Sequence, residues 1–292
     1  MAGPSTNGSG QIVKREPTRT EIAKHKQDGL IRLLQGMGPE IARALPKHIT
    51  ADRIARIAMT AIRTTPHLDE CSPASFVACV LSSAQLGLEV NTPMGQAYLI
   101  PRKNKDGQYE GTLMVGYQGL LALVDRAGCV RERNFFIVHE GDTFDYEYGL
   151  NPNITHKPCA RPGAMTHGYV TAKLTNGGRA FLVMTKSEID ARRARGANGP
   201  AWRTDYESMA KKTLAREFCK WLPKSAEMAL AVSIDEGTER GRAVSEGTSP
   251  EVIDVLASAG LTENANDNRF DADTGEVLGD PTPEELKEAR AA

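Results

Sequence analysis

The residues best suited to chemistry lie in one basic segment, WRTDYESMAKKTLAREFCKWLPK at residues 202–224. If residues 205–221 form a helix, Lys212, Arg216 and Lys220 stand at i, i+4 and i+8 and form one column on its surface. Three cations in such a column extend along about 12 Å of helix axis. That length suits contact with successive phosphates of a nucleic-acid strand. The pattern predicts a phosphate-binding helix, and an amphipathic helix with solvated charges is the alternative.

The segment before this helix adds more positive charge. Residues 185–195 are predicted to form a second basic helix, which begins with a capping box of Thr185 and Glu188. A second capping box, Thr204 and Glu207, is predicted to begin the first helix. Positive charge that stays unpaired on two consecutive helices favours a polyanionic partner. The candidate contacts on these helices are Lys211, Lys212, Arg216, Lys220, Arg192, Arg193 and Arg203.

Further candidates lie outside these helices. A hairpin with its turn at Asp106–Gly107 places cations at its tip, although lysines there also commonly protect exposed edges. Two arginines that alternate on a later strand are expected to share one face of a sheet. Aromatic rings can stack on bases, although each ring is more often part of a core. The candidates are Arg102, Lys103, Lys105, Arg131, Arg133, Tyr98, Tyr117 and Trp202, whereas Phe218 and Trp221 are predicted to face the core.

Missing motifs exclude several classes of enzyme. The chain has no GxxxxGK[ST] loop for ATP, and its six histidines and five cysteines have no zinc-binding spacing. An acidic group, Asp142, Asp145 and Glu147, leaves a metal-dependent nuclease as the alternative function, although turn and strand positions explain these acids more simply. We therefore expect a protein that binds nucleic-acid strands, with no evident catalytic site and no cofactor, in which a divalent metal at most modulates binding.

The order of the elements that must position these residues predicts an α+β fold. Capped helices come first, with Thr50 and Ser72 as N-caps and Gly87 at a C-terminus. A central antiparallel sheet of about five strands follows, with hairpin turns at Asp106–Gly107 and Asn176–Gly178, and helices then return. We expect a groove whose floor is the sheet and whose wall is the helix of residues 205–221.

Composition divides the chain into three parts. Residues 1–19 are expected to be a disordered N-terminal tail, residues 20–238 a single α+β DNA-binding domain, and residues 239–292 an acidic, mostly flexible tail with weak helical patches at 249–260 and 282–291. The chain has 36 basic and 37 acidic residues, of which 5 basic and 15 acidic lie from residue 235 onward. The basic body is typical of a protein that binds a polyanion. No membrane span or signal peptide is evident, which predicts a cytoplasmic protein.

Several segments in order resemble the RecT-type single-strand annealing proteins of phages and prophages. They are ALPKHITADRIARIAMTAIR, SFVACVLSSAQLGLE with GQAYLIPR, VGYQGLLALVDRAG, EGDTFDYEYGL, and WRTDYESMAKKTLAREFCKWLP followed by AVSIDE. Together they extend from about residue 41 to residue 235. Each segment alone is weakly specific, but the five in this order and spacing are strongly specific for the family.

The resemblance implies a function in homologous recombination. Such proteins coat single-stranded DNA, anneal it to a complementary strand without ATP and so form duplex DNA. They assemble as homo-oligomers, in rings or helical filaments, in the cytoplasm of a bacterial host. A partner exonuclease and a host single-strand binding protein are the further partners implied. On this chain the resemblance points to Lys211, Lys212, Arg216, Lys220, Arg102, Lys103, Lys105, Tyr117 and Gln118.

Overall fold

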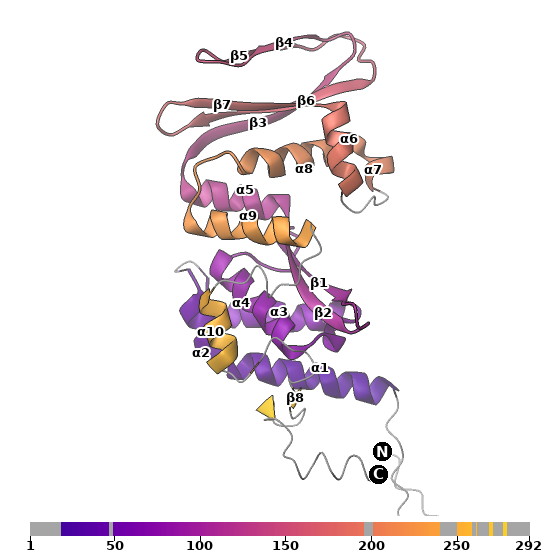
Figure 1. The fold of residues 1–292 in the computed structure, drawn as a ribbon, viewed down its shortest axis with the longest axis vertical. Coiled ribbons are helices and arrows are strands. Elements are labelled where there is room, and N and C mark those ends of the chain that lie inside the picture. Colours follow the sequence, from indigo (N-terminus) through magenta and orange to yellow (C-terminus); the bar gives the residue numbers. More distant parts are fainter. Residues whose placement is uncertain are drawn as a thin grey trace, which may run out of the picture.

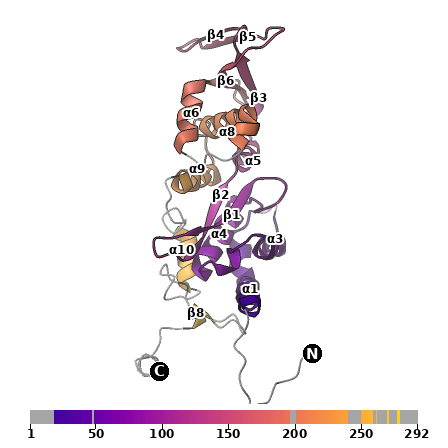
Figure 2. The same ribbon diagram turned by 90° about the vertical axis from the view of Figure 1, so that its right-hand side faces the viewer.

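The structure of the chain, a computed structural model, describes residues 19–46, 49–195, 201–239, 250–258, 261, 269–270 and 277–278. The described part is elongated, with a layer of helices at one end, a sheet towards the other and further helices between them (Figures 1 and 2). Helices combine with antiparallel strands, so the predicted α+β class is confirmed. The predicted N-terminal tail and the helical patch at 282–291 lie outside the described residues, apart from the terminal residue 19.

The N-terminal layer consists of α1 (Arg19–Gly36), α2 (Gly38–Ala44), α3 (Ala51–Thr64), the 3-10 helix η1 (Leu68–Glu70) and α4 (Pro73–Leu86). Local signals predicted their ends correctly. The Thr50 hydroxyl accepts the backbone N–H of Arg53 at the start of α3, and the Ser72 hydroxyl caps α4 in the same way. Gly87 follows α4 with a left-handed φ of 58°. Nearly every residue of α4 is buried, so this helix forms the centre of the layer.

A two-stranded hairpin of β1 (Ala97–Lys103) and β2 (Tyr109–Val115) leads from this layer into α5 (Tyr117–Ala127). Its turn lies at the predicted place, where Gly107 has a φ of 80°. The Asn104 side chain stabilises the turn by accepting the N–H of Asp106. The first turn of α5 packs on the loop before β1, where a Cβ on Gly119 would lie 2.2 Å from the carbonyl oxygen of Gln96. Only glycine permits this approach.

The predicted strands are divided between several sheets. The largest has the order β3 (Val130–His139), β6 (Met165–Leu174), β7 (Arg179–Thr185), all antiparallel, with the β6–β7 turn where it was predicted. A separate hairpin of β4 (Thr143–Glu147) and β5 (Asn153–Lys157) packs over one face of this sheet. Far along the chain, β8 (Arg269–Phe270) pairs with β9 (Val277–Leu278). The sequence therefore predicted antiparallel pairing but not this division.

The returning helices are α6 (Lys186–Arg195), α7 (Ala201–Thr204), α8 (Tyr206–Cys219), α9 (Ala226–Glu239) and α10 (Pro250–Ser258). The capping box of Thr185 and Glu188 is present, since each side chain accepts the other residue's N–H. The second predicted box is wrong, because Thr204 belongs to α7. Asp205 caps α8 instead, and its carboxylate accepts the N–H of Ser208.

Helix α8 lies between the three-stranded sheet on one side and α5 on the other, with α9 beside α5 (Figure 1). Trp221, predicted to face the core, is 81% exposed. The prediction failed because α8 ends at Cys219, so the helical spacing no longer sets the direction of the side chain. Within the part of the chain that the structure describes, no helix has both the length and the apolar character that crossing a membrane requires.

Candidate nucleic-acid interface

A groove of about 750 Å³ lies between the returning helices and the base of the β1–β2 hairpin. One wall comes from α8 and α6. The opposite wall comes from Tyr98 of β1, Met114 of β2 and the start of α5 at Tyr117. The three-stranded sheet lies behind α8, so it does not form the floor that was expected from the sequence.

The three cations of the predicted column all line this groove. Lys212, Arg216 and Lys220 lie along the wall formed by α8, as their i, i+4, i+8 spacing predicted. Lys211 is exposed and does not line the groove. The spacing therefore predicted which stripe of the helix faces the groove, and its role in DNA binding stays a prediction.

The cations of this column differ in their partners. Arg216 binds Asp235 of α9 through two hydrogen bonds, Nη2 to Oδ1 at 2.5 Å and Nε to Oδ2 at 3.2 Å. Lys220 Nζ lies 3.3 Å from Glu217 and 3.7 Å from Glu236. The interpretation of these cations as unpaired is therefore wrong for both residues. The carboxylate of Asp235 is 1% exposed inside the fold.

Lys212 is different, because no carboxylate of the described residues lies within ion-pair distance of it. Its ammonium group lies 5.8 Å from the centre of the Tyr117 ring, a cation–π contact across the groove. The Tyr117 hydroxyl accepts a hydrogen bond of 2.8 Å from the side chain of Gln118, which is exposed. Lys212 is thus the groove cation best placed to take a new anion.

Helix α6 adds two arginines to the groove. Arg192 binds Glu217 at 3.3 Å, and Arg193 lies 5.6 Å from the centre of the Trp202 ring. Trp202 is only 7% exposed and packs edge-on against Tyr206, so it is part of the core rather than an open platform for bases. Arg203 is exposed outside the groove.

The cations of the β1–β2 hairpin do not line the groove. Arg102 donates to the carbonyl oxygen of Thr238 at the end of α9, at 3.3 Å. Lys103 lies 5.2 Å from the centre of the Tyr109 ring, and Lys105 is exposed at the turn. The groove is at the other end of this hairpin, so a role for these three residues in DNA binding stays a prediction.

The arginines of β3 also lie away from the groove. The strand register shifts between Val130 and Glu132, which puts Arg131 in an irregular position and interrupts the predicted alternation. Arg131 is exposed, whereas Arg133 forms an ion pair with Asp125 at the end of α5. Arg133 therefore connects the sheet to α5.

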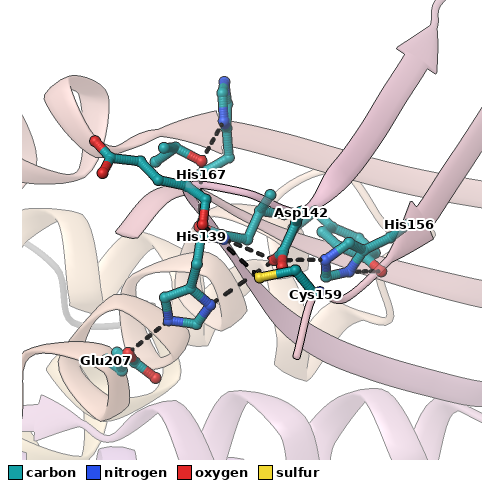
Figure 3. Close-up of polar contacts among 10 residues, drawn as sticks. His139, Asp142, His156, Cys159, His167 and Glu207 are labelled. Atoms are coloured by element: carbon teal, nitrogen blue, oxygen red, sulfur yellow. Dashed lines mark hydrogen bonds and ion pairs between the residues drawn. The ribbon is translucent and has the colours of Figure 1, made fainter. Parts of the chain in front are cut away.

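The acids considered for a nuclease do not converge on a metal site. Asp142 accepts the backbone N–H groups of Cys159 and His139, both at 2.8 Å, and its Oδ2 lies 3.0 Å from His156 Nε2 (Figure 3). These hydrogen bonds, with the one from Cys159 as the largest cause, hold the pKa of Asp142 well below its usual range. The other two acids are exposed on β4. In the described part of the chain no group of three suitable side chains could hold a metal.

The residues around Asp142 also connect the sheet to the groove helix. His139 at the end of β3 lies 2.9 Å from Glu207 in the first turn of α8 (Figure 3). His156 contacts the hydroxyl of Tyr169 on β6 at 3.1 Å. The cluster fixes the turn before β4 and its position beside α8, which is a structural role.

Comparison with known proteins agrees with the resemblance. A family model described as the RecT family matches residues 52–249. The chain belongs to the RecT family. Protein RecT of Escherichia coli (strain K12) is 42% identical over 233 residues, which cover 77% of this chain and 86% of that protein. The uncharacterized protein YqaK of Bacillus subtilis (strain 168) is 28% identical over 191 residues, 64% of this chain and 65% of that protein. As a RecT-family member, the chain is a recombination protein of the single-strand annealing type.

Sequence reasoning missed the carboxylates of the groove. Glu217 and Glu236 line it together with the cations. The spacing of Glu217 and Lys220, three residues apart on one helix, was the one local signal for such a pair. The contact of Glu217 with Arg192 of α6 and that of Arg216 with Asp235 of α9 depend on how separate helices pack. No local sequence pattern shows such packing.

Proposed function

We propose that this RecT-family chain binds single-stranded DNA in the groove and anneals it to a complementary strand without ATP or another cofactor. The observation that best supports this is the convergence of five cations from α6 and α8 on one groove that also contains Tyr98 and Tyr117. Cations along a line suit a phosphate backbone, and rings beside them suit bases. The cations are Arg192, Arg193, Lys212, Arg216 and Lys220.

In this proposal the protein holds the backbone of the first strand and leaves its base edges open to an incoming strand. Phosphate contacts position a strand without reading its sequence, so base pairing supplies the selectivity. Tyr98 is 37% exposed at the groove and can stack on a base of any kind. No step needs a nucleotide cofactor, and a divalent metal acts only on the strength of binding.

We also propose that several copies act together. The groove volume of about 750 Å³ lies in the range of pockets for small ligands, which is room for a few nucleotides only. A strand long enough to form a stable duplex must therefore cross several copies, in a ring or a filament. A partner exonuclease that exposes the strand and a host single-strand binding protein complete the proposal, and they rest on the family resemblance.

A salt series on single-stranded oligonucleotide binding, followed by fluorescence anisotropy, tests the proposal. The logarithm of the binding constant should fall against the logarithm of salt concentration with a slope of about −0.7 for each phosphate contacted. Annealing of complementary oligonucleotides should proceed in EDTA without ATP. A flat salt dependence, or loss of labelled DNA on addition of Mg²⁺, would contradict it.

Two neighbouring lysines provide a matched pair of variants for the site. Lys212→Glu should weaken binding about tenfold and slow annealing, because Lys212 faces the groove. Lys211→Glu changes the same charge one residue away on an exposed position outside the groove. Equal effects of the two substitutions would mean that the groove is not where the strand binds.

A further inference from the structure

Glu217 of α8 holds two cations of the groove at the same time. Its Oε2 lies 3.3 Å from both Nε and Nη2 of Arg192 on α6. Its Oε1 lies 3.3 Å from Nζ of Lys220. The side chain is 22% exposed on the groove wall. One carboxylate therefore neutralises two of the cations that a DNA backbone would contact.

This arrangement is also the one in which the groove would hold a phosphate. Each oxygen of the carboxylate has a charged donor, and Arg192 directs two N–H groups at one of them, as a guanidinium can also do with a phosphate oxygen. A phosphate in the same place needs the same N–H groups, so carboxylate and phosphate exclude one another. Lys220 has a second carboxylate, Glu236, at 3.7 Å, whereas Lys212 has none within ion-pair distance among the described residues.

We infer that Glu217 is a built-in counter-ion, which occupies the phosphate position between Arg192 and Lys220 when the groove is empty and is displaced when a strand binds. The inference rests on the proposed function of the groove. Binding then exchanges a carboxylate for a phosphate instead of filling an open positive site. Because the displaced carboxylate stays beside Arg192 and Lys220 and still offsets part of their charge, the site neutralises less phosphate charge, and DNA releases fewer counterions than it makes contacts.

Glu217 consequently sets how tightly and how reversibly the strand is held. The displaced carboxylate stays close to the bound phosphate on the same wall and repels it, since the two carry like charge in a partly dry site. The repulsion lowers affinity and speeds release of the backbone. An annealing protein must let its product leave, and a counter-ion beside the phosphates serves that step.

The test is Glu217→Gln in the full chain, because glutamine keeps the shape and an acceptor oxygen but not the charge. We expect single-stranded DNA to bind about fivefold more tightly at moderate salt, a fold-change that corresponds to about 1 kcal/mol. The salt slope should become steeper by about 0.7, because the loss of one negative charge lets the site neutralise about one more phosphate. The control is Glu207→Gln, which makes the same charge change on the same helix outside the groove, where Glu207 contacts His139.

A structural role for Glu217 predicts the opposite outcome. If the carboxylate only clamps α6 to α8, Glu217→Gln will bind DNA no better than Glu207→Gln, with an unchanged slope, and the inference is overturned. If Glu217→Gln does not fold, Glu217→Asp decides, since the shorter side chain keeps the charge but draws it back from Arg192 and Lys220. Tighter binding than in a Glu207→Asp control supports the inference, and equal binding overturns it. If the wild-type chain binds DNA with no dependence on salt concentration, the proposed function itself is refuted. The failure of the inference about Glu217 and the failure of the proposed function are therefore distinguishable.

Discussion

Replacing Arg216 with alanine is expected to damage the fold as well as DNA binding. The Asp235 carboxylate is 1% exposed, and both of its oxygens bind the Arg216 guanidinium, which is 31% exposed. Removing one partner of a buried ion pair typically costs about 3–5 kcal/mol. Because water can reach the space that Arg216 leaves, we expect about 2–3 kcal/mol here. This corresponds to a melting temperature about 5–10 °C lower for a domain of this size.

Thermal and urea unfolding followed by circular dichroism measures this effect, and anisotropy with a labelled oligonucleotide measures binding in the same samples. Lys212→Ala is the matched control, since Lys212 lies one turn earlier on the same groove wall. It should weaken binding while its melting temperature stays within about 1 °C of the wild type. The double variant Arg216→Ala with Asp235→Ala should be less destabilised than the sum of the two single variants, because it removes both partners of the ion pair together.

A clear result would refute this reasoning. If Arg216→Ala unfolds at the wild-type midpoint but loses DNA binding, the guanidinium is a phosphate ligand that contributes nothing to the fold. If the prediction holds, reversing the charge at Arg216 is not a clean test of the DNA site. Such a variant would place a second carboxylate beside buried Asp235, so weaker binding could reflect unfolding. Lys212 is the better residue for that purpose.

Three further predictions concern other parts of the fold. Trp221 is 81% exposed, so Trp221→Lys should leave the melting temperature within about 1 °C of the wild type. It should also remove the component of tryptophan fluorescence that acrylamide quenches most strongly. A large loss of stability would mean that Trp221 is packed. Gly119→Ala should lower the free energy of urea unfolding by about 2 kcal/mol or more, because the new Cβ would lie 2.2 Å from the carbonyl oxygen of Gln96. Gly237→Ala is the control. No atom lies within 4 Å of its new Cβ, so it should be neutral or stabilising. Asp142→Asn should lower the midpoint of thermal unfolding at neutral pH. The pKa of Asp142 is lower in the folded protein than in the unfolded chain, where it is about 3.9. The stability that the ionised carboxylate contributes is therefore present above the unfolded-state pKa and is lost as the pH falls through the folded-state pKa. The difference between Asp142→Asn and wild type in a pH series should therefore narrow below about pH 4, and a constant difference would contradict the assignment.

The features that the sequence predicted correctly are those that depend on residues close together in the chain. The N-cap at Thr50, the left-handed Gly87 and the turn at Gly107 each follow from the backbone needs of one or two residues. The column of Lys212 and its neighbours follows from the helical repeat alone. None of these depends on how distant elements pack, so local rules were sufficient.

The predictions that failed are those that depend on where a helix ends or on how distant elements pack. The direction of Trp221 was extrapolated from a helical repeat that stops at Cys219. The ion pair of Asp235 with Arg216 was not predicted, because composition cannot show that α9 buries this carboxylate against α8. Antiparallel strands were predicted correctly, but their division among sheets depends on long-range pairing, such as that of β3 with β6. The pairing of Arg192 with Glu217 was missed for the same reason.

The packing of α8 bears on how the groove adapts to a strand. On one side the helix rests against the backbone of β6, where a Cβ on Gly168 would lie 2.7 Å from a methyl group of Leu214. Elsewhere it is held to α9 by the buried pair of Arg216 and Asp235. Because α8 is held in two directions, the proposed exchange of Glu217 for a phosphate needs only rotation of side chains and no shift of the helix. The rate at which a strand leaves the groove is then governed by competition between charges, and it should depend on salt far more than on the stability of the fold.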